Sequence, residues 1–165
     1  LAVRWPGKVE SDSVSDVPVI SVDFYPTLLD IAGVEPPAGQ VLDGENIMPV
    51  LQGESSLERD AIFWHFPAYL QPYNRRQWPW RISPCSAVRK GDWKLIEFFE
   101  YGTLELYNLR EDISESENLS EKMPEKTKEL FADLEAWRKK LHAPIPTEPN
   151  PDYAPDEVSI DDFFD

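Results

Sequence analysis

The stretch SAVRKGDWKLIEFFEYGTLELYNL, residues 86–109, decides the fold. Apolar and polar residues alternate along its segments, and this two-residue period is typical of β-strands with one buried face. The turn Lys90-Gly91-Asp92 and the turn at Tyr101-Gly102 are too short for a crossover connection, so consecutive strands are expected to pair antiparallel. The stretch therefore predicts an antiparallel meander of three strands.

Two further elements flank this meander. AIFWHF, residues 61–66, is rich in aromatic residues and predicts another strand. MPEKTKELFADLEAWRKKL, residues 123–141, predicts a long helix whose apolar stripe consists of Leu130, Leu134, Trp137 and Leu141. The expected fold class is α+β, with a small antiparallel β-sheet packed against a C-terminal amphipathic helix.

The first 60 residues have a different pattern. LAVRW, residues 1–5, predicts a buried strand that ends at Pro6-Gly7. SVDFYPTLLDIAG, residues 21–33, predicts a helix with Asp23 as its N-cap and a glycine at its end. The predicted organisation is a strand–helix segment with a Pro/Gly-rich connector (1–60), the sheet with its helix (61–143) and a Pro-rich acidic tail (144–165). A chain that opens within a strand also suggests a fragment.

Composition narrows the function classes. The formal net charge is −15, which argues against nucleic acid or an anionic membrane surface as a partner. The chain has one cysteine, which rules out an internal disulfide and a multi-thiolate zinc site. No apolar run approaches the roughly 18 residues of a membrane span.

One window departs from this acidic composition. Asp and Glu make up 31 of the 165 residues, so about six are expected in residues 61–91, yet that window contains none. Arginine recognises oxyanions with paired hydrogen bonds, and an aromatic ring offers a platform for a sugar face. The predicted substrate-binding residues of this window are His65, Arg75, Arg76, Trp78 and Arg81. The alternative is a strand and a loop whose aromatic side chains complete the core.

The order of motifs resembles a known family. VRWPGKV, SVDFYPTLLDIAGV, LDGENIMPVLQG, FWHFPAY, AVRKGDWKLIEFFE and LELYNLREDISESENL follow one another, with a charged helix and PTEPNPDY after them. This series is similar to the C-terminal third of the sulfatases, arylsulfatase-like sulfuric ester hydrolases of the alkaline-phosphatase superfamily, over residues 1 to about 153. The resemblance implies that residues 1–60 end an α/β catalytic domain and that residues 61–143 form its C-terminal subdomain.

The resemblance also implies a catalytic apparatus elsewhere. In this family a cysteine oxidised to formylglycine attacks the sulfate and calcium holds it, and both sites precede the VRWPG strand. No catalytic residue, metal ligand or cofactor is therefore expected in this chain. Cys85-Ser86-Ala87-Val88-Arg89 matches one form of the nucleophile motif in letters. Its segment enters a predicted strand without nearby carboxylates, so we do not expect Cys85 to be catalytic.

These observations lead to one function and two alternatives. The chain is expected to be the C-terminal part of a sulfatase that hydrolyses sulfate esters of sugars, contributing substrate-recognition loops and inactive alone. Its expected partners are a sulfated carbohydrate or aryl sulfate and the N-terminal catalytic domain. The alternatives are a stand-alone binding module for sulfated glycans and a structural remnant of a truncated sulfatase. The family is often exported, but this chain leaves its compartment open.

Overall fold

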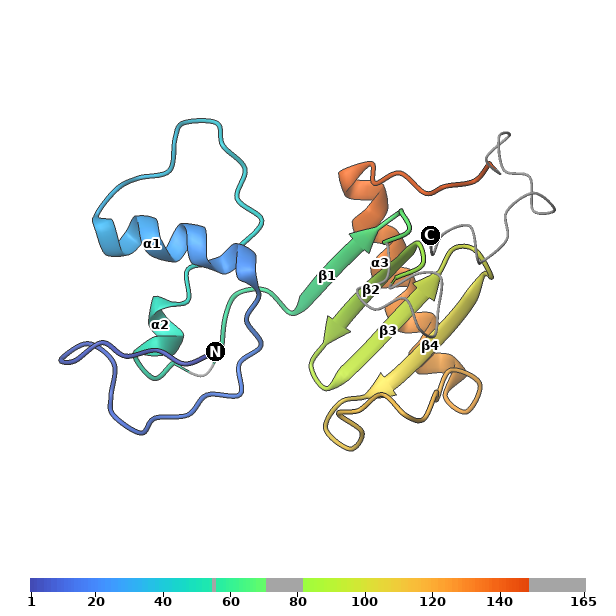
Figure 1. The fold of residues 1–165 in the computed structure, drawn as a ribbon, viewed down its shortest axis with the longest axis horizontal. Coiled ribbons are helices and arrows are strands. Elements are labelled where there is room, and N and C mark those ends of the chain that lie inside the picture. The colour runs from blue at the N-terminus through green and yellow to red at the C-terminus, as the bar shows by residue number, and fades with distance from the viewer. Residues whose placement is uncertain (55, 71–81, 149–165) are drawn as a thin grey trace, which may run out of the picture. The chain divides into compact units, whose positions relative to one another are not determined.

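The computed structural model describes residues 1–54, 56–70 and 82–148 (Figure 1). The chain divides into two compact units, Leu1–Asp60 (unit 1) and Ala61–Asp165 (unit 2). Within the described residues, no helix is long and apolar enough to cross a membrane.

Unit 2 is built on a four-stranded antiparallel sheet. Its strands are β1 (Ala61–Phe66), β2 (Cys85–Lys90), β3 (Trp93–Phe98) and β4 (Thr103–Asn108), in that spatial order. Gly91 takes a positive φ of 57° in the β2–β3 turn, which a residue without Cβ adopts at little cost. The predicted meander is confirmed, and β1 pairs with β2 as the fourth strand.

The helix α3 (Pro124–Leu141) covers one face of this sheet (Figure 1). The core between them consists of five residues that are at most 1% exposed: Val88, Leu95, Leu106, Leu130 and Leu134. At its edge the Phe63 and Trp137 rings stack with their centroids 4.9 Å apart. The predicted α+β class is confirmed.

The predicted apolar stripe of α3 is wrong at its end. Leu141 is 50% exposed, whereas Arg138 is only 5% exposed. The Arg138 guanidinium forms an ion pair with Glu97 of β3, so a charged side chain takes the sheet-facing position in the last turn. The helix then ends at His142, whose positive φ of 52° turns the chain away.

Unit 1 contains a 3₁₀ turn, η1 (Ser21–Asp23), and two helices, α1 (Phe24–Ala32) and α2 (Met48–Leu51). α1 ends at Gly33, which has a φ of 65°, as the sequence predicts. The strand predicted for residues 1–5 is wrong: these residues have no regular secondary structure, and Leu1 is 77% exposed. A strand needs a neighbour for its backbone groups, and the strands of the described residues all belong to unit 2.

A polar cluster, here called the Asp23 hub, holds unit 1 together. The Asp23 carboxylate is fully buried and accepts hydrogen bonds from the backbone N–H groups of Ile20 (2.8 Å) and Glu45 (3.1 Å) and from the Arg59 guanidinium. Asp23 occupies the N-cap position of α1 that the sequence predicts, but its side chain makes no capping bond to that helix. Its carboxylate instead accepts hydrogen bonds from the turn that precedes α1 and from two segments that are distant in the sequence.

Thr27 and Gly44 also hold the start of α1 against residues 44–47. The Thr27 hydroxyl donates to the Asp23 carbonyl at 2.6 Å and accepts from the Ile47 N–H at 3.0 Å. A Cβ on Gly44 would lie 2.2 Å from the Val22 carbonyl oxygen. Glycine is therefore needed where residues 44–47 pass along the start of α1.

Acid should loosen the hub. Burial raises the pKa of Asp23, but the bonds from Arg59, Ile20 and Glu45 outweigh it and hold the pKa below its ordinary value. A folded pKa below the unfolded one gives stability that is present above about pH 4 and lost as the pH falls through the folded value. We expect the Ile20 and Glu45 amides to lose hydrogen-exchange protection in this range. Asp23→Asn should remove most of that pH dependence, and an unchanged profile in this variant would contradict the assignment.

Candidate functional site

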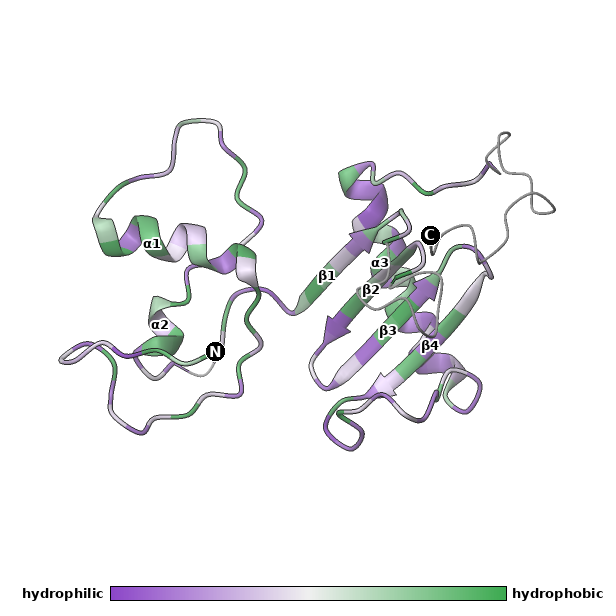
Figure 2. Ribbon diagram, in the orientation of Figure 1, coloured by the Kyte–Doolittle hydropathy of each residue, from purple (hydrophilic) through white to green (hydrophobic). Residues whose placement is uncertain are grey.

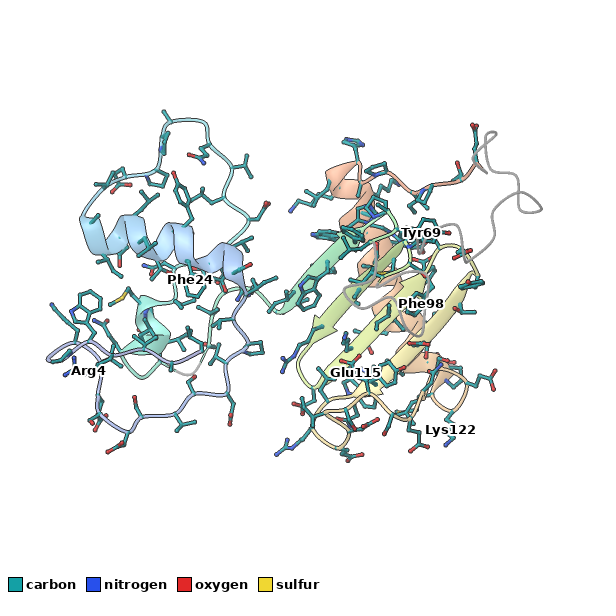
Figure 3. The ribbon with its side chains drawn as sticks, in the orientation of Figure 1. Arg4, Phe24, Tyr69, Phe98, Glu115 and Lys122 are labelled. Carbon is teal, nitrogen blue, oxygen red and sulfur yellow. The ribbon has the colours of Figure 1, made fainter. Side chains whose placement is uncertain are left out.

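The predicted substrate-binding residues fall into two groups. His65 lies in β1 and is described, whereas Arg75, Arg76, Trp78 and Arg81 lie outside the described residues. On either side of that stretch, Leu70 and Ile82 form an isolated antiparallel bridge, with Leu70 N–H donating to the Ile82 carbonyl at 3.0 Å. The residues that flank 71–81 are therefore adjacent, next to the ends of β1 and β2. Tyr69, labelled in Figure 3, belongs to this flank.

Both ring nitrogens of His65 already have protein partners. Nε2 lies 2.8 Å from the Pro144 carbonyl oxygen, and Nδ1 lies 2.7 Å from the Ser86 hydroxyl oxygen. Because a carbonyl only accepts, Nε2 donates to Pro144, and in the tautomer with its hydrogen on Nε2 the Nδ1 atom accepts from the Ser86 hydroxyl. The ring also lies 5.8 Å from the Phe99 ring centroid. A ligand would reach a ring nitrogen only by displacing one of these bonds, and the substrate contact of His65 stays a prediction.

His65 belongs to a polar row on the α3-facing side of the sheet. Ser86 stands between His65 and Glu97 in the strand register and is fully buried. Glu97 in turn pairs with Arg138 of α3, whose guanidinium carbon lies 5.5 Å from the Phe99 ring centroid. The row ties both α3 and the segment at Pro144 to the sheet.

Sequence reasoning missed this row, although a signal existed. Ser86 is two residues before the core residue Val88, and Glu97 is two residues after the core residue Leu95. Because alternate residues of a strand share a face, both polar side chains point toward the helix. Two polar residues in phase with the core predict buried polar partners.

Cys85 is the first residue of β2 and lies opposite Phe66 and Phe98 in the neighbouring strands. It is a half-buried free thiol. Burial raises the pKa of this thiol, and the Lys94 ammonium offsets part of that rise. A raised pKa leaves less of the reactive thiolate, which is the opposite of what a nucleophile needs.

Acidic side chains of the turn after β4 are paired with protein groups. The Asp112 carboxylate accepts from the N–H groups of Ser116 (2.7 Å) and Glu117 (2.9 Å), and these bonds help to lower its pKa. Glu115 and Lys122, labelled in Figure 3, pair with Lys94 and Glu117. Within the described residues, no group of three or more His, Cys, Asp or Glu side chains could hold a metal ion.

A pocket at the end of α3 is a poor candidate for an anion. It is lined by Glu135, Arg138, Lys139, His142, Ala143 and Ile145. Arg138 is already paired with Glu97, and the C-terminal end of a helix carries a partial negative charge. Both features disfavour a sulfate there.

The comparison with solved structures identifies the class of protein. The chain matches BT4656, solved in complex with its substrate D-glucosamine-2-N,6-O-disulfate, with a TM-score of 0.68 and 30% sequence identity. The match covers 88% of this chain and 29% of that one. A sulfatase of Formosa agariphila is 34% identical over 154 residues, which cover 87% of this chain and 27% of the relative. The fold and these relatives are those of sulfuric ester hydrolases.

The family follows directly. The model of the family described as N-sulphoglucosamine sulphohydrolase, C-terminal, matches residues 1–143, and the chain belongs to this family. An N-acetylglucosamine-6-O-sulfatase of Bacteroides thetaiotaomicron is 32% identical over 154 residues, covering 90% of this chain and 26% of the relative. The sulfatase resemblance is confirmed. The chain spans between a quarter and a third of the length of these relatives.

Proposed function

We propose that this chain is the C-terminal part of a sulfatase acting on sulfated sugars, and that it contributes substrate recognition and not the catalytic centre. The observation that carries the proposal is the match of residues 1–143 to the C-terminal family model. The sugar class is supported by two relatives, one named for N-acetylglucosamine 6-sulfate chemistry and one solved with a disulfated glucosamine.

The residues of this chain do not fit the formylglycine and calcium that the family implies. Cys85 lies on a strand between Phe66 and Phe98, and its pKa is raised by burial. A calcium ion needs six to eight oxygen ligands, yet residues 61–91 around this cysteine contain no carboxylate side chain. We therefore assign no catalytic step to these residues.

The recognition role is assigned to the basic and aromatic stretch between β1 and β2. Arg75, Arg76 and Arg81 would bind sulfate oxygens with paired, charge-assisted hydrogen bonds, and the Trp78 ring would cover a sugar face. The bridge between Leu70 and Ile82 supports this role, because it gives both flanks of the stretch a common anchor.

A stand-alone binding module for sulfated glycans is the second candidate. It is favoured by the core of unit 2, because the buried residues Val88, Leu95, Leu106 and Leu134 form a cluster whose members all belong to this unit. This candidate uses the same recognition residues and differs only in needing no catalytic partner.

Binding of D-glucosamine-2-N,6-O-disulfate to this chain tests the recognition role. We expect saturable binding by NMR titration, weakened about tenfold or more by Arg75→Ala or Arg76→Ala, because a hydrogen bond to a charged group contributes about 1.5–3 kcal/mol. Added salt should weaken it further. Arg110→Ala is the matched control, because Arg110 is an exposed arginine of unit 2.

Two outcomes would contradict the proposal. Equal affinities of the Arg75, Arg76 and Arg110 variants would remove the recognition role of the stretch. Hydrolysis of an aryl sulfate by this chain, abolished by Cys85→Ala, would overturn the non-catalytic assignment.

A further inference from the structure

The sheet of unit 2 has two outer edges, and they differ in how their backbone groups are paired. On the outer side of β4, the Asn118 side chain accepts from the Leu106 N–H at 3.0 Å and donates to the Leu104 carbonyl at 3.2 Å. The Leu119 N–H donates to the Leu106 carbonyl at 2.8 Å. These bonds occupy the backbone groups that an added strand would need, so the segment after β4 closes this edge.

The strand register shows which backbone groups face outward on β1, the other edge strand (Figure 1). In an antiparallel ladder a residue exchanges both bonds with one neighbouring strand, and the next residue along the chain faces the opposite way. Leu104 and Leu106 face outward on β4. Carried across the uninterrupted registers of β3 and β2, this alternation reaches β1. The outward groups of β1 belong to Ala61, Phe63 and His65, and the residues between them bond to β2.

This outer side of β1, here called the open edge, lacks the usual protection of an edge strand. Within the part of the chain that the structure describes, the outward N–H and C=O groups of Ala61, Phe63 and His65 have no backbone partner. Edge strands are normally protected by charged side chains, proline or a bulge. AIFWHF contains no Asp, Glu, Lys, Arg or proline, and its pairing with β2 has no bulge. β1 begins in the hydrophobic colour of Figure 2, whereas the adjacent end of β2 is hydrophilic. The open edge is therefore suited to pairing with another strand.

The chain that leaves α3 arrives at the open edge. The Pro144 carbonyl oxygen lies 2.8 Å from Nε2 of His65, one of the outward residues of β1. Prolines recur at positions 144, 146, 149, 151 and 155, and a strand inside a sheet tolerates proline poorly. Residues 156–165, DEVSIDDFFD, contain no proline and include two β-branched and two aromatic side chains, which favour a strand.

Length and charge both fit this segment to the open edge. The connection formed by residues 145–155 can extend over about 36 Å, whereas a six-residue strand is about 20 Å long, so the segment can reach all of β1. Residues 156–165 contain five Asp and Glu, whereas residues 61–91 contain five Arg and Lys and no Asp or Glu. In a chain with a net charge of −15, this window is where an acidic segment meets the least repulsion.

We propose that residues 156–165 add to the open edge of β1 as a fifth strand of the unit 2 sheet. Their backbone would pair with the outward groups of Phe63 and His65, closing this edge as Asn118 closes the other. The family model ends at residue 143, so the segment lies outside the family match. The inference does not rest on the proposed function. A second copy of this chain and an extended segment of another protein are the other possible occupants, and the experiments separate them.

Amide hydrogen exchange, followed by NMR, tests the pairing. The full chain is compared with a chain that ends after Glu148. We expect the Phe63 and His65 amides to exchange at least about tenfold more slowly in the full chain, because pairing suppresses their exposure to water. The Ile62 and Trp64 amides bond to β2 and are the internal control, with equal rates in both chains. Equal rates for Phe63 and His65 in the two chains would leave the open edge to another protein and overturn the proposal.

Two proline variants of the full chain distinguish strand pairing from a loose apolar contact. Successive N–H groups of an added strand point alternately to β1 and to solvent, so Ser159→Pro and Ile160→Pro should have unequal effects. One variant removes a bond to β1 and should abolish the protection of Phe63 and His65. The other places proline on the new outer edge, where it is tolerated, and is the matched control. Equal loss of protection in both variants, or no loss in either, would contradict a fifth strand.

Protein concentration separates residues 156–165 of the same chain from a second copy. Pairing within one chain does not depend on concentration, so the protection of Phe63 and His65 should stay constant over about a hundredfold range. The full chain should also elute as a monomer throughout this range. Protection that rises with concentration, together with a dimer, would assign the open edge to a second copy and overturn the proposal.

Discussion

Asp23→Ala is expected to unfold unit 1 while unit 2 keeps its structure. The variant would leave the Arg59 guanidinium, whose side chain is 15% exposed, without its partner, and would remove the acceptor of the Ile20 and Glu45 N–H groups. Breaking a buried ion pair from one side costs about 3–5 kcal/mol. At roughly 0.05–0.15 kcal/mol per residue, a unit of this size has about 3–9 kcal/mol of stability in total, so the change removes much or all of it.

The measurement is amide hydrogen exchange, resolved by unit. Asp30→Ala is the control, because Asp30 is an exposed aspartate of the same helix. The double variant Asp23→Ala/Arg59→Ala should cost less than the sum of the two single changes, because it leaves no buried charge without a partner. Equal protection of unit 1 in the Asp23 and Asp30 variants would show that the hub does not stabilise this unit.

The same residue shows where sequence reasoning stops. The meander and α3 were predictable because their signals, a two-residue alternation closed by Gly91 and a 3.6-residue period, are local. Besides the nearby Ile20, the partners of the Asp23 carboxylate are 22 and 36 residues away, at Glu45 and Arg59. A local pattern identifies Asp23 as a helix cap, and only the folded chain shows a buried acceptor.

The candidate site was predictable to the same extent. The gap in acidic residues over 61–91 identified a basic and aromatic window, and its recognition role stays a prediction. The sequence identified His65 as a candidate from its residue type. It could not identify the partner of this side chain, because Pro144 lies 79 residues away. The sequence also predicted the helix α1. It did not predict that Thr27 would be buried, because that depends on its hydrogen bond with the segment at Ile47.

Leu134→Ala is expected to destabilise unit 2 by about 2–5 kcal/mol, which is the usual cost of removing a buried leucine side chain. Leu134 is fully buried between α3 and the sheet, in contact with the cluster of Val88, Leu95 and Leu106. Chemical denaturation followed by Trp fluorescence, with the loss of protection in β2 and β3 as the unit-specific signal, measures the change.

Leu141→Ala is the matched control, because Leu134 and Leu141 occupy equivalent positions of the same predicted stripe, seven residues apart. Leu141 is 50% exposed and Arg138 takes the sheet-facing position beside it, so we expect its loss to cost less than about 1 kcal/mol. The helical period alone predicts equal effects for the two leucines, whereas the packing in the structure predicts a large effect only for Leu134. The two variants therefore distinguish these expectations. If both variants lost several kcal/mol, the last turn of α3 would belong to the core after all, and the ion pair of Arg138 with Glu97 would be a surface contact and not part of the packing.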